Sequence, residues 1–163
     1  MKKVIIISLA FLSCGQKFNK VKYCDAILNI ELRTGELVAA TSLFNDTIFL
    51  NIFKYSNLYK EEAIAFLSDS SYSEQQKMIS VFSMQNLNVN NYIDYAEKSF
   101  VFYEQNKISD NILRVVLSSD VNSNNLKKVY GDKRFLSMVK NVYLLPKSSD
   151  KLKRIANAIL IGN

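Results

Sequence analysis

Helix-breaking residues are almost absent from the interior of this 163-residue chain, and their scarcity constrains its fold more than any motif. The sequence holds four glycines and one proline, and two of the glycines, Gly15 and Gly162, lie near its ends. Only Gly35, Gly131 and Pro146 interrupt the interior. A β-sandwich or barrel needs many tight turns, which these residue types usually supply. The sequence therefore predicts helices joined by polar turns.

Capping residues mark where these helices begin. Ser73 followed by Gln76 matches a capping box, in which the two side chains satisfy each other's free backbone donors. The helix that follows is expected to run to about Leu87. Other helices are expected to be capped by Asp46, Ser56, Ser109, Asp132 and the segment 148–150.

Other segments carry weaker signals. The ranges 24–33 and 36–44 form one helix or two. Range 47–55 is rich in Thr, Ile and Phe, which also favour strands, but its apolar pairs four residues apart favour a helix. Range 120–125 is the longest polar loop. The helix 126–130 after it is expected to close at Gly131, in the left-handed conformation that glycine adopts at helix ends.

The sum is about eight short helices joined by loops of two to six residues. Short loops make sequential helices pack antiparallel. The sequence therefore predicts an all-α single domain over 23–163, built as a stack of antiparallel helical hairpins like a short HEAT-like array. No strict repeat is visible at a fixed period.

The N-terminus MKKVIIISLAFLSCGQ resembles a bacterial lipoprotein signal peptide. Two lysines precede an apolar run that is too short to span a bilayer, which needs roughly 20 apolar residues. We expect residues 1–13 to be removed, Cys14 to be lipidated and 14–22 to form a tether. This address predicts a periplasmic protein anchored to the membrane by lipid, with the outer membrane favoured. Cleavage after Gly15 would instead leave a soluble periplasmic protein.

The chain contains no histidine, which removes the usual general base of hydrolases and the commonest transition-metal ligand. After export Cys24 is the one remaining cysteine, so a thiolate metal site is excluded. Cys24 is either a buried, inert thiol, or it forms an intermolecular disulfide or serves as a reactive thiol. We therefore expect no enzyme activity, no catalytic residue, no metal and no cofactor.

Charge is distributed unevenly along the chain. Residues 127–154 contain nine basic and two acidic side chains, a net charge of +7, whereas 15–126 carry −3. Nucleic acid is a poor partner for an exported protein. The basic C-terminal end is therefore expected to contact anionic lipid headgroups or an acidic partner, or to form a solvated helix face.

Two phrases, YSEQQKMISVFSMQNL at 72–87 and NNLKKVYGDKRFL at 124–136, resemble the small periplasmic immunity proteins that neutralise peptidoglycan amidases of type VI secretion systems. The resemblance covers about two fifths of the chain, from Tyr72 to Leu136. Such proteins commonly dimerise and push a loop into the active-site cleft of the toxin. The resemblance therefore implies that a helix-to-helix loop binds the partner. The candidate loop residues are Asp69, Ser70 and Tyr72, and Asp120, Asn122 and Asn124.

The sequence thus predicts an exported, lipid-anchored binding protein that plugs a cell-wall amidase toxin. The alternative is a structural or adaptor lipoprotein of the cell envelope with no inhibitory role. A homodimer is left open. Toxin genes beside the gene would support the first hypothesis, and assembly or transport genes the second.

The export prediction can be checked by mass spectrometry of the mature N-terminus. We expect a chain that begins at Cys14 and carries the mass of attached lipid. A chain that begins after Gly15 would agree with the predicted export but contradict the predicted lipid anchor. An intact Met1 on a protein isolated from the cell envelope would contradict both.

Overall fold

The computed structural model describes residues 22–34, 43–118 and 123–162, and within these ranges the chain forms nine α-helices and no strand. In chain order the helices are α1 (Tyr23–Thr34), α3 (Thr47–Lys54), α4 (Ser56–Ser68), α5 (Glu74–Ser83), α6 (Val89–Glu104), α7 (Asp110–Ser118), α8 (Ser123–Tyr130), α9 (Lys133–Leu144) and α10 (Asp150–Ile161). The predicted all-α class is confirmed.

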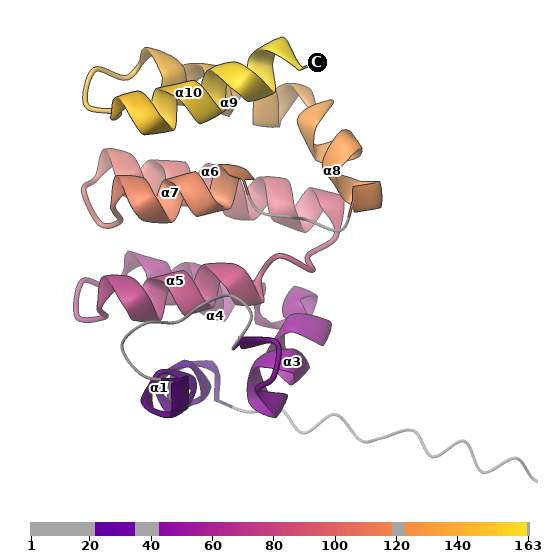
Figure 1. Ribbon diagram of the computed structural model, residues 1–163, viewed down its shortest axis with the longest axis vertical. Coiled ribbons are helices and arrows are strands. Elements are labelled where there is room, and N and C mark those ends of the chain that lie inside the picture. Colours follow the sequence, from indigo (N-terminus) through magenta and orange to yellow (C-terminus); the bar gives the residue numbers. More distant parts are fainter. Residues whose placement is uncertain (1–21, 35–42, 119–122, 163) are drawn as a thin grey trace, which may run out of the picture.

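Six of the described helices pair into three antiparallel hairpins that stack along the long axis of the molecule (Figure 1). The hairpins are α4–α5, α6–α7 and α9–α10. The first helix of each hairpin packs on the first helix of the next, so that α6 contacts both α4 and α9. The second helices pack in the same way, and α7 contacts both α5 and α10. At one end of the stack α1 packs on α3, α4 and α5, and α10 lies at the other end. The predicted stack of helical hairpins is confirmed.

Each hairpin repeats one buried aromatic position on its first helix. Tyr59, Tyr95 and Phe135 are 0%, 1% and 0% exposed. They are separated by 36 and then 40 residues. The spacing is unequal because the connection between the second and third hairpins contains α8, whereas the first two hairpins are joined by residues 84–88. The array is therefore a repeat without a fixed sequence period.

The ambiguous segment 47–55 is helical, as its apolar spacing predicts. Asp46 caps α3, because its Oδ1 accepts the backbone N–H groups of Ile48 and Phe49 at 2.8 and 2.9 Å. Phe49 and Ile52 are buried together against the core. A strand here would place these two side chains on opposite faces, so the buried side of α3 decides its structure.

Three expected helix ends are wrong. Ser56 does not cap α4: it lies inside the first turn, and its buried Oγ has no hydrogen-bond partner. Helix α5 ends at Ser83 rather than Leu87, because Leu87 N–H donates to Met84 O in a turn that buries both side chains. Gly131 does not adopt a left-handed conformation. A Cβ atom at this position would lie 3.2 Å from Lys127 O, and this close contact favours glycine here instead.

Two predicted segments at the N-terminus lie outside the described residues: the signal peptide 1–13, and the tether 14–22 except for its last residue. Residues 35–42 and 119–122 also lie outside them. None of the helices that the structure describes has the length and hydrophobicity needed to cross a bilayer.

The buried aromatic position should dominate stability. Phe135→Ala removes a side chain that is 0% exposed and stacked on Tyr130, and we expect it to lower the free energy of unfolding by about 3–5 kcal/mol. Leu58→Ala is the matched control, because Leu58 is 55% exposed and should change stability by less than about 1 kcal/mol. Urea unfolding followed by circular dichroism measures both. Equal effects of the two substitutions would contradict the assigned core.

Candidate functional site

The three hairpin loops lie on the same side of the stack and form what we call the loop edge, residues 69–73, 105–109 and 145–149 (Figure 1). Each loop has five residues and ends in a serine that caps the next helix. Ser73, Ser109 and Ser149 each accept, through Oγ, the backbone N–H of the residue three positions on, at 3.1, 3.3 and 3.3 Å. The predicted capping box of Ser73 is confirmed.

The same serines connect one layer to the next. In each case an acidic side chain of the preceding layer accepts a hydrogen bond from the capping serine, and we call this series the acid–serine ladder. The pairs are Glu31 with Ser73 Oγ at 3.4 Å, Glu74 with Ser109 Oγ at 2.7 Å, and Asp110 with the Ser149 backbone N–H at 3.1 Å. Because carboxylates form strong charge-assisted hydrogen bonds, the ladder sets the positions of the loops relative to one another.

Lys147 joins the third layer to the second. Its Nζ donates to Glu104 O at 3.1 Å, to Asn106 Oδ1 at 2.8 Å and to Tyr103 O, and lies 4.5 Å from the centre of the Tyr103 ring. These carbonyls end α6, where the helix dipole favours a cation. Asn106 has a positive φ of 59°, which turns the chain out of the helix beneath this ammonium group.

Lys77 joins the first layer to the second in a similar way. It is 5% exposed, and its Nζ donates to Lys107 O at 2.8 Å. Removal from water lowers the pKa of the Lys77 ammonium, and the negative charge of Asp69 opposes that change. One lysine therefore fastens the middle loop from each neighbouring layer.

Tyr103 and Asp110 form the centre of the loop edge. Tyr103 Oη donates to Asp110 Oδ1 at 2.5 Å and to Lys147 O at 3.3 Å. Burial, together with the hydrogen bond to Asp110, raises the pKa of Tyr103 to about 12, so the phenol stays protonated. Burial alone would raise the pKa of Asp110, but hydrogen bonds from Ser149 and Tyr103 outweigh it and hold that pKa below its ordinary value.

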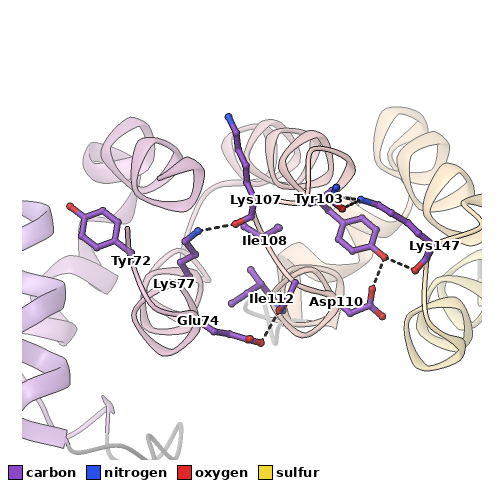
Figure 2. Close-up of a pocket in the computed structure, with 11 residues that line it drawn as sticks. Tyr72, Glu74, Lys77, Tyr103, Lys107, Ile108, Asp110, Ile112 and Lys147 are labelled. Atoms are coloured by element: carbon purple, nitrogen blue, oxygen red, sulfur yellow. Dashed lines mark hydrogen bonds between the residues drawn. The ribbon is translucent and has the colours of Figure 1, made fainter. Parts of the chain in front are cut away.

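A groove of about 500 Å³ opens between these groups. In Figure 2 Tyr72 lies at one end of it, Tyr103 at the other, and Ile108 and Ile112 between them. Its charged side chains come from all three layers: Glu74, Lys77, Lys107, Asp110 and Lys147. The side chains of four of these five form hydrogen bonds between layers, whereas the exposed side chain of Lys107 forms none of these bonds. The groove therefore has a firmly held polar wall around a small apolar floor, which suits recognition of another molecule.

The predicted loop 69–72 lies on this edge. Asp69 and Ser70 are exposed at its tip, and Asp69 Oδ1 accepts the Ser71 N–H at 2.8 Å, which lowers the pKa of Asp69. The Tyr72 ring stacks on Phe66 with centroids 3.8 Å apart and lines the groove. The loop tip is thus held in one conformation by its own turn and by the stacked ring.

The second predicted loop is not assembled with the first. Asn124 belongs to α8, which begins at Ser123, so its expected place in a loop is wrong. Helix α8 lies on the side of the stack away from the loop edge (Figure 1). Asp120, Asn122 and the lipidation candidate Cys14 lie outside the described residues. Cys24 is half-buried beside Tyr72, so the choice between an inert and an exposed thiol stays open.

Sequence reasoning missed the central residues of the loop edge. A signal was present in the nearly identical phrases 107–110 (KISD) and 147–150 (KSSD), which place lysine, serine and acid at matching positions of two loops. Within the part of the chain that the structure describes, no three Cys, Asp or Glu side chains gather as metal ligands.

Comparisons with protein-family models, curated proteins and solved structures found no match to this chain. Its function is therefore argued from its own residues.

The contribution of the acid–serine ladder to stability can be tested by substituting two aspartates, Asp110 and Asp150, that begin equivalent helices. Asp110→Asn weakens the bonds from Tyr103 and Ser149, and we expect it to lower the free energy of unfolding by about 1–2 kcal/mol at neutral pH. Asp150→Asn is the control, because Asp150 also begins a helix after a capping serine but its side chain accepts no hydrogen bond from another described layer; its effect should be below about 0.5 kcal/mol.

The pH dependence follows from the lowered pKa of Asp110. A carboxylate whose folded pKa is depressed stabilises the fold above its unfolded pKa of about 3.9, and this contribution disappears as pH falls through the folded value. The difference between Asp110→Asn and the unchanged protein should therefore be constant near neutrality and shrink in acid. A difference that grows on acidification would contradict the assignment.

Proposed function

We propose that this chain is an exported, lipid-anchored binding protein that neutralises a cell-wall amidase toxin in the periplasm. In this proposal the loop 69–72 enters the active-site cleft of the toxin and the groove beside it receives a side chain of the toxin. The mechanism is steric, so the protein supplies no catalytic group. The N-terminal signal peptide directs export of the protein, and lipid attached at Cys14 anchors it to the membrane.

The observation that carries the proposal is the construction of the loop edge. Asp69 and Ser70 project from a turn that is already fixed, and Tyr72 connects this turn to the groove. A loop that is ordered before binding loses little conformational entropy when it enters a cleft, which favours tight inhibition. A loop that had to order on binding would make a weaker plug.

The groove supports a protein partner more than a small substrate. Its wall is made of side chains that already hydrogen-bond within the protein, and the exposed cation Lys107 stands at its rim. Tyrosine, which stands at both ends of the groove, is enriched where proteins contact each other.

The test uses the mature protein, purified from cells that express the full chain, and the product of an effector-like gene next to its own. We expect the mature protein to inhibit the peptidoglycan hydrolysis that the product of the neighbouring gene catalyses. Ser70→Arg adds bulk at an exposed tip position, so inhibition should weaken at least about tenfold, which corresponds to about 1.4 kcal/mol of binding free energy.

Asn90→Arg is the matched control, because Asn90 is exposed in the first turn of α6, at the edge opposite the loops. It should leave inhibition unchanged. If no neighbouring product is bound or inhibited, and the neighbouring genes encode assembly or transport proteins, the adaptor function replaces this proposal.

A further inference from the structure

The α10 end of the stack presents a helical face that no further layer covers. Within the described chain, each earlier hairpin is covered by the next one, whereas the outer side of α9–α10 is open (Figure 1). A shallow groove of about 620 Å³ runs between the two helices there, lined by residues from both. We call this surface the end face and define it by Tyr143, Leu144, Asp150, Lys153, Arg154 and Asn157.

The end face combines apolar area with unpaired positive charge. Tyr143 and Leu144 are 42% and 63% exposed, among the largest values for apolar side chains in the described residues. Lys153 and Arg154 form no ion pair within the described residues, whereas Arg134, lower on the same hairpin, pairs with Asp94 at 3.1 Å. Tyrosine and arginine are both enriched at the centre of protein interfaces.

The acid–serine ladder also stops here. Asp110 accepts a hydrogen bond from the capping serine of the layer above it, and Asp150 is the corresponding residue of the last layer. No hydrogen bond to the Asp150 side chain is formed within the described residues. The end face thus continues the arrangement with which the lower layers seat the next helices, and no other described helix covers it.

We propose that the end face binds an amphipathic helix of a protein partner, whose acidic side chains face Lys153 and Arg154 and whose apolar side chains cover Tyr143 and Leu144. The charge of the chain supports an acidic partner, because residues 127–154 carry a net charge of +7. A second copy joined face to face would bring Lys153 and Arg154 of both copies together, and like charges across an interface oppose binding. Grooves between helices commonly bind an amphipathic helix in this way.

The position of the face favours protein over lipid. Helix α1, which follows the proposed lipid anchor, lies at the opposite end of the long axis (Figure 1). A membrane held at that end is far from α10. This step depends on the proposed anchor at Cys14, but the apolar and charged composition of the face does not.

The test uses the mature protein and a synthetic helical peptide with leucines on one face and glutamates on the other. We expect binding by calorimetry, with changes in backbone NMR signals concentrated at Tyr143 and Leu144. The double variant Lys153→Glu/Arg154→Glu should weaken binding at least about tenfold. The control Lys127→Glu/Lys128→Glu changes the net charge equally on exposed positions of α8 and should weaken it by less than about threefold.

Four results would overturn the proposal. Equal weakening in both double variants would mean that only net charge matters, and equal binding of a peptide with lysines in place of glutamates would exclude charge recognition. Binding to vesicles of phosphatidylglycerol and phosphatidylcholine, lost only in Lys153→Glu/Arg154→Glu, would assign the face to lipid. Self-association lost in that variant would assign it to a second copy. None of these results depends on whether the loop edge inhibits a toxin.

Discussion

Hydrogen bonds between successive layers at the loop edge fix how the hairpins stack. Burial of the apolar core, which includes Tyr59, Tyr95 and Phe135, stabilises the fold, but apolar burial has no preferred direction and tolerates helices that slide or rotate. The bonds from Ser109 to Glu74 and from Ser149 to Asp110 exist in one register only. The ladder therefore selects one arrangement among those that the apolar core would accept, and the groove exists because of that arrangement.

The two lysines of the loop edge hold their ammonium groups in different surroundings, because Lys77 is buried and Lys147 is exposed. Removing an ammonium group from water is costly unless it is hydrogen-bonded. Lys147 keeps contact with water, and its ammonium group meets three acceptors and an aromatic face at the negative end of α6. Lys77 meets one carbonyl and is nearly covered. Both lysines bond to the middle loop, which is thereby the most constrained of the three.

The presence of most helices could be predicted from the sequence, because helix formation depends on local signals. The capping box at Ser73 and the cap at Asp132 both form, and so does α3, whose apolar pairs at four-residue spacing outweighed its strand-favouring residues. Ends set by distant contacts were not readable. Helix α5 stops at Ser83 because Met84 and Leu87 must both reach the core, which depends on a neighbouring helix rather than on the residues themselves.

The candidate site shows the same division. The loop 69–72 was identified from its polar residues, but the groove beside it could not be, because Glu74, Tyr103 and Lys147 come together only through the stacking of three hairpins. The repeated phrases KISD and KSSD were visible, but two copies alone do not define a repeat period. A pattern of lysine, serine and acid is informative only when its two copies are known to lie in adjacent layers.

In the proposed interactions, the loop edge and the end face recognise their partners through different physical forces. At the loop edge most charges are already compensated within the protein, so affinity there depends on shape and on the exposed tip at Asp69 and Ser70. At the end face Lys153 and Arg154 form no ion pair within the described residues, so their attraction for an acidic partner would be long-ranged and weakened by salt. The stack of hairpins thus presents two separate surfaces, one set by the register of its layers and one formed by the side of α9–α10 that no other described helix covers.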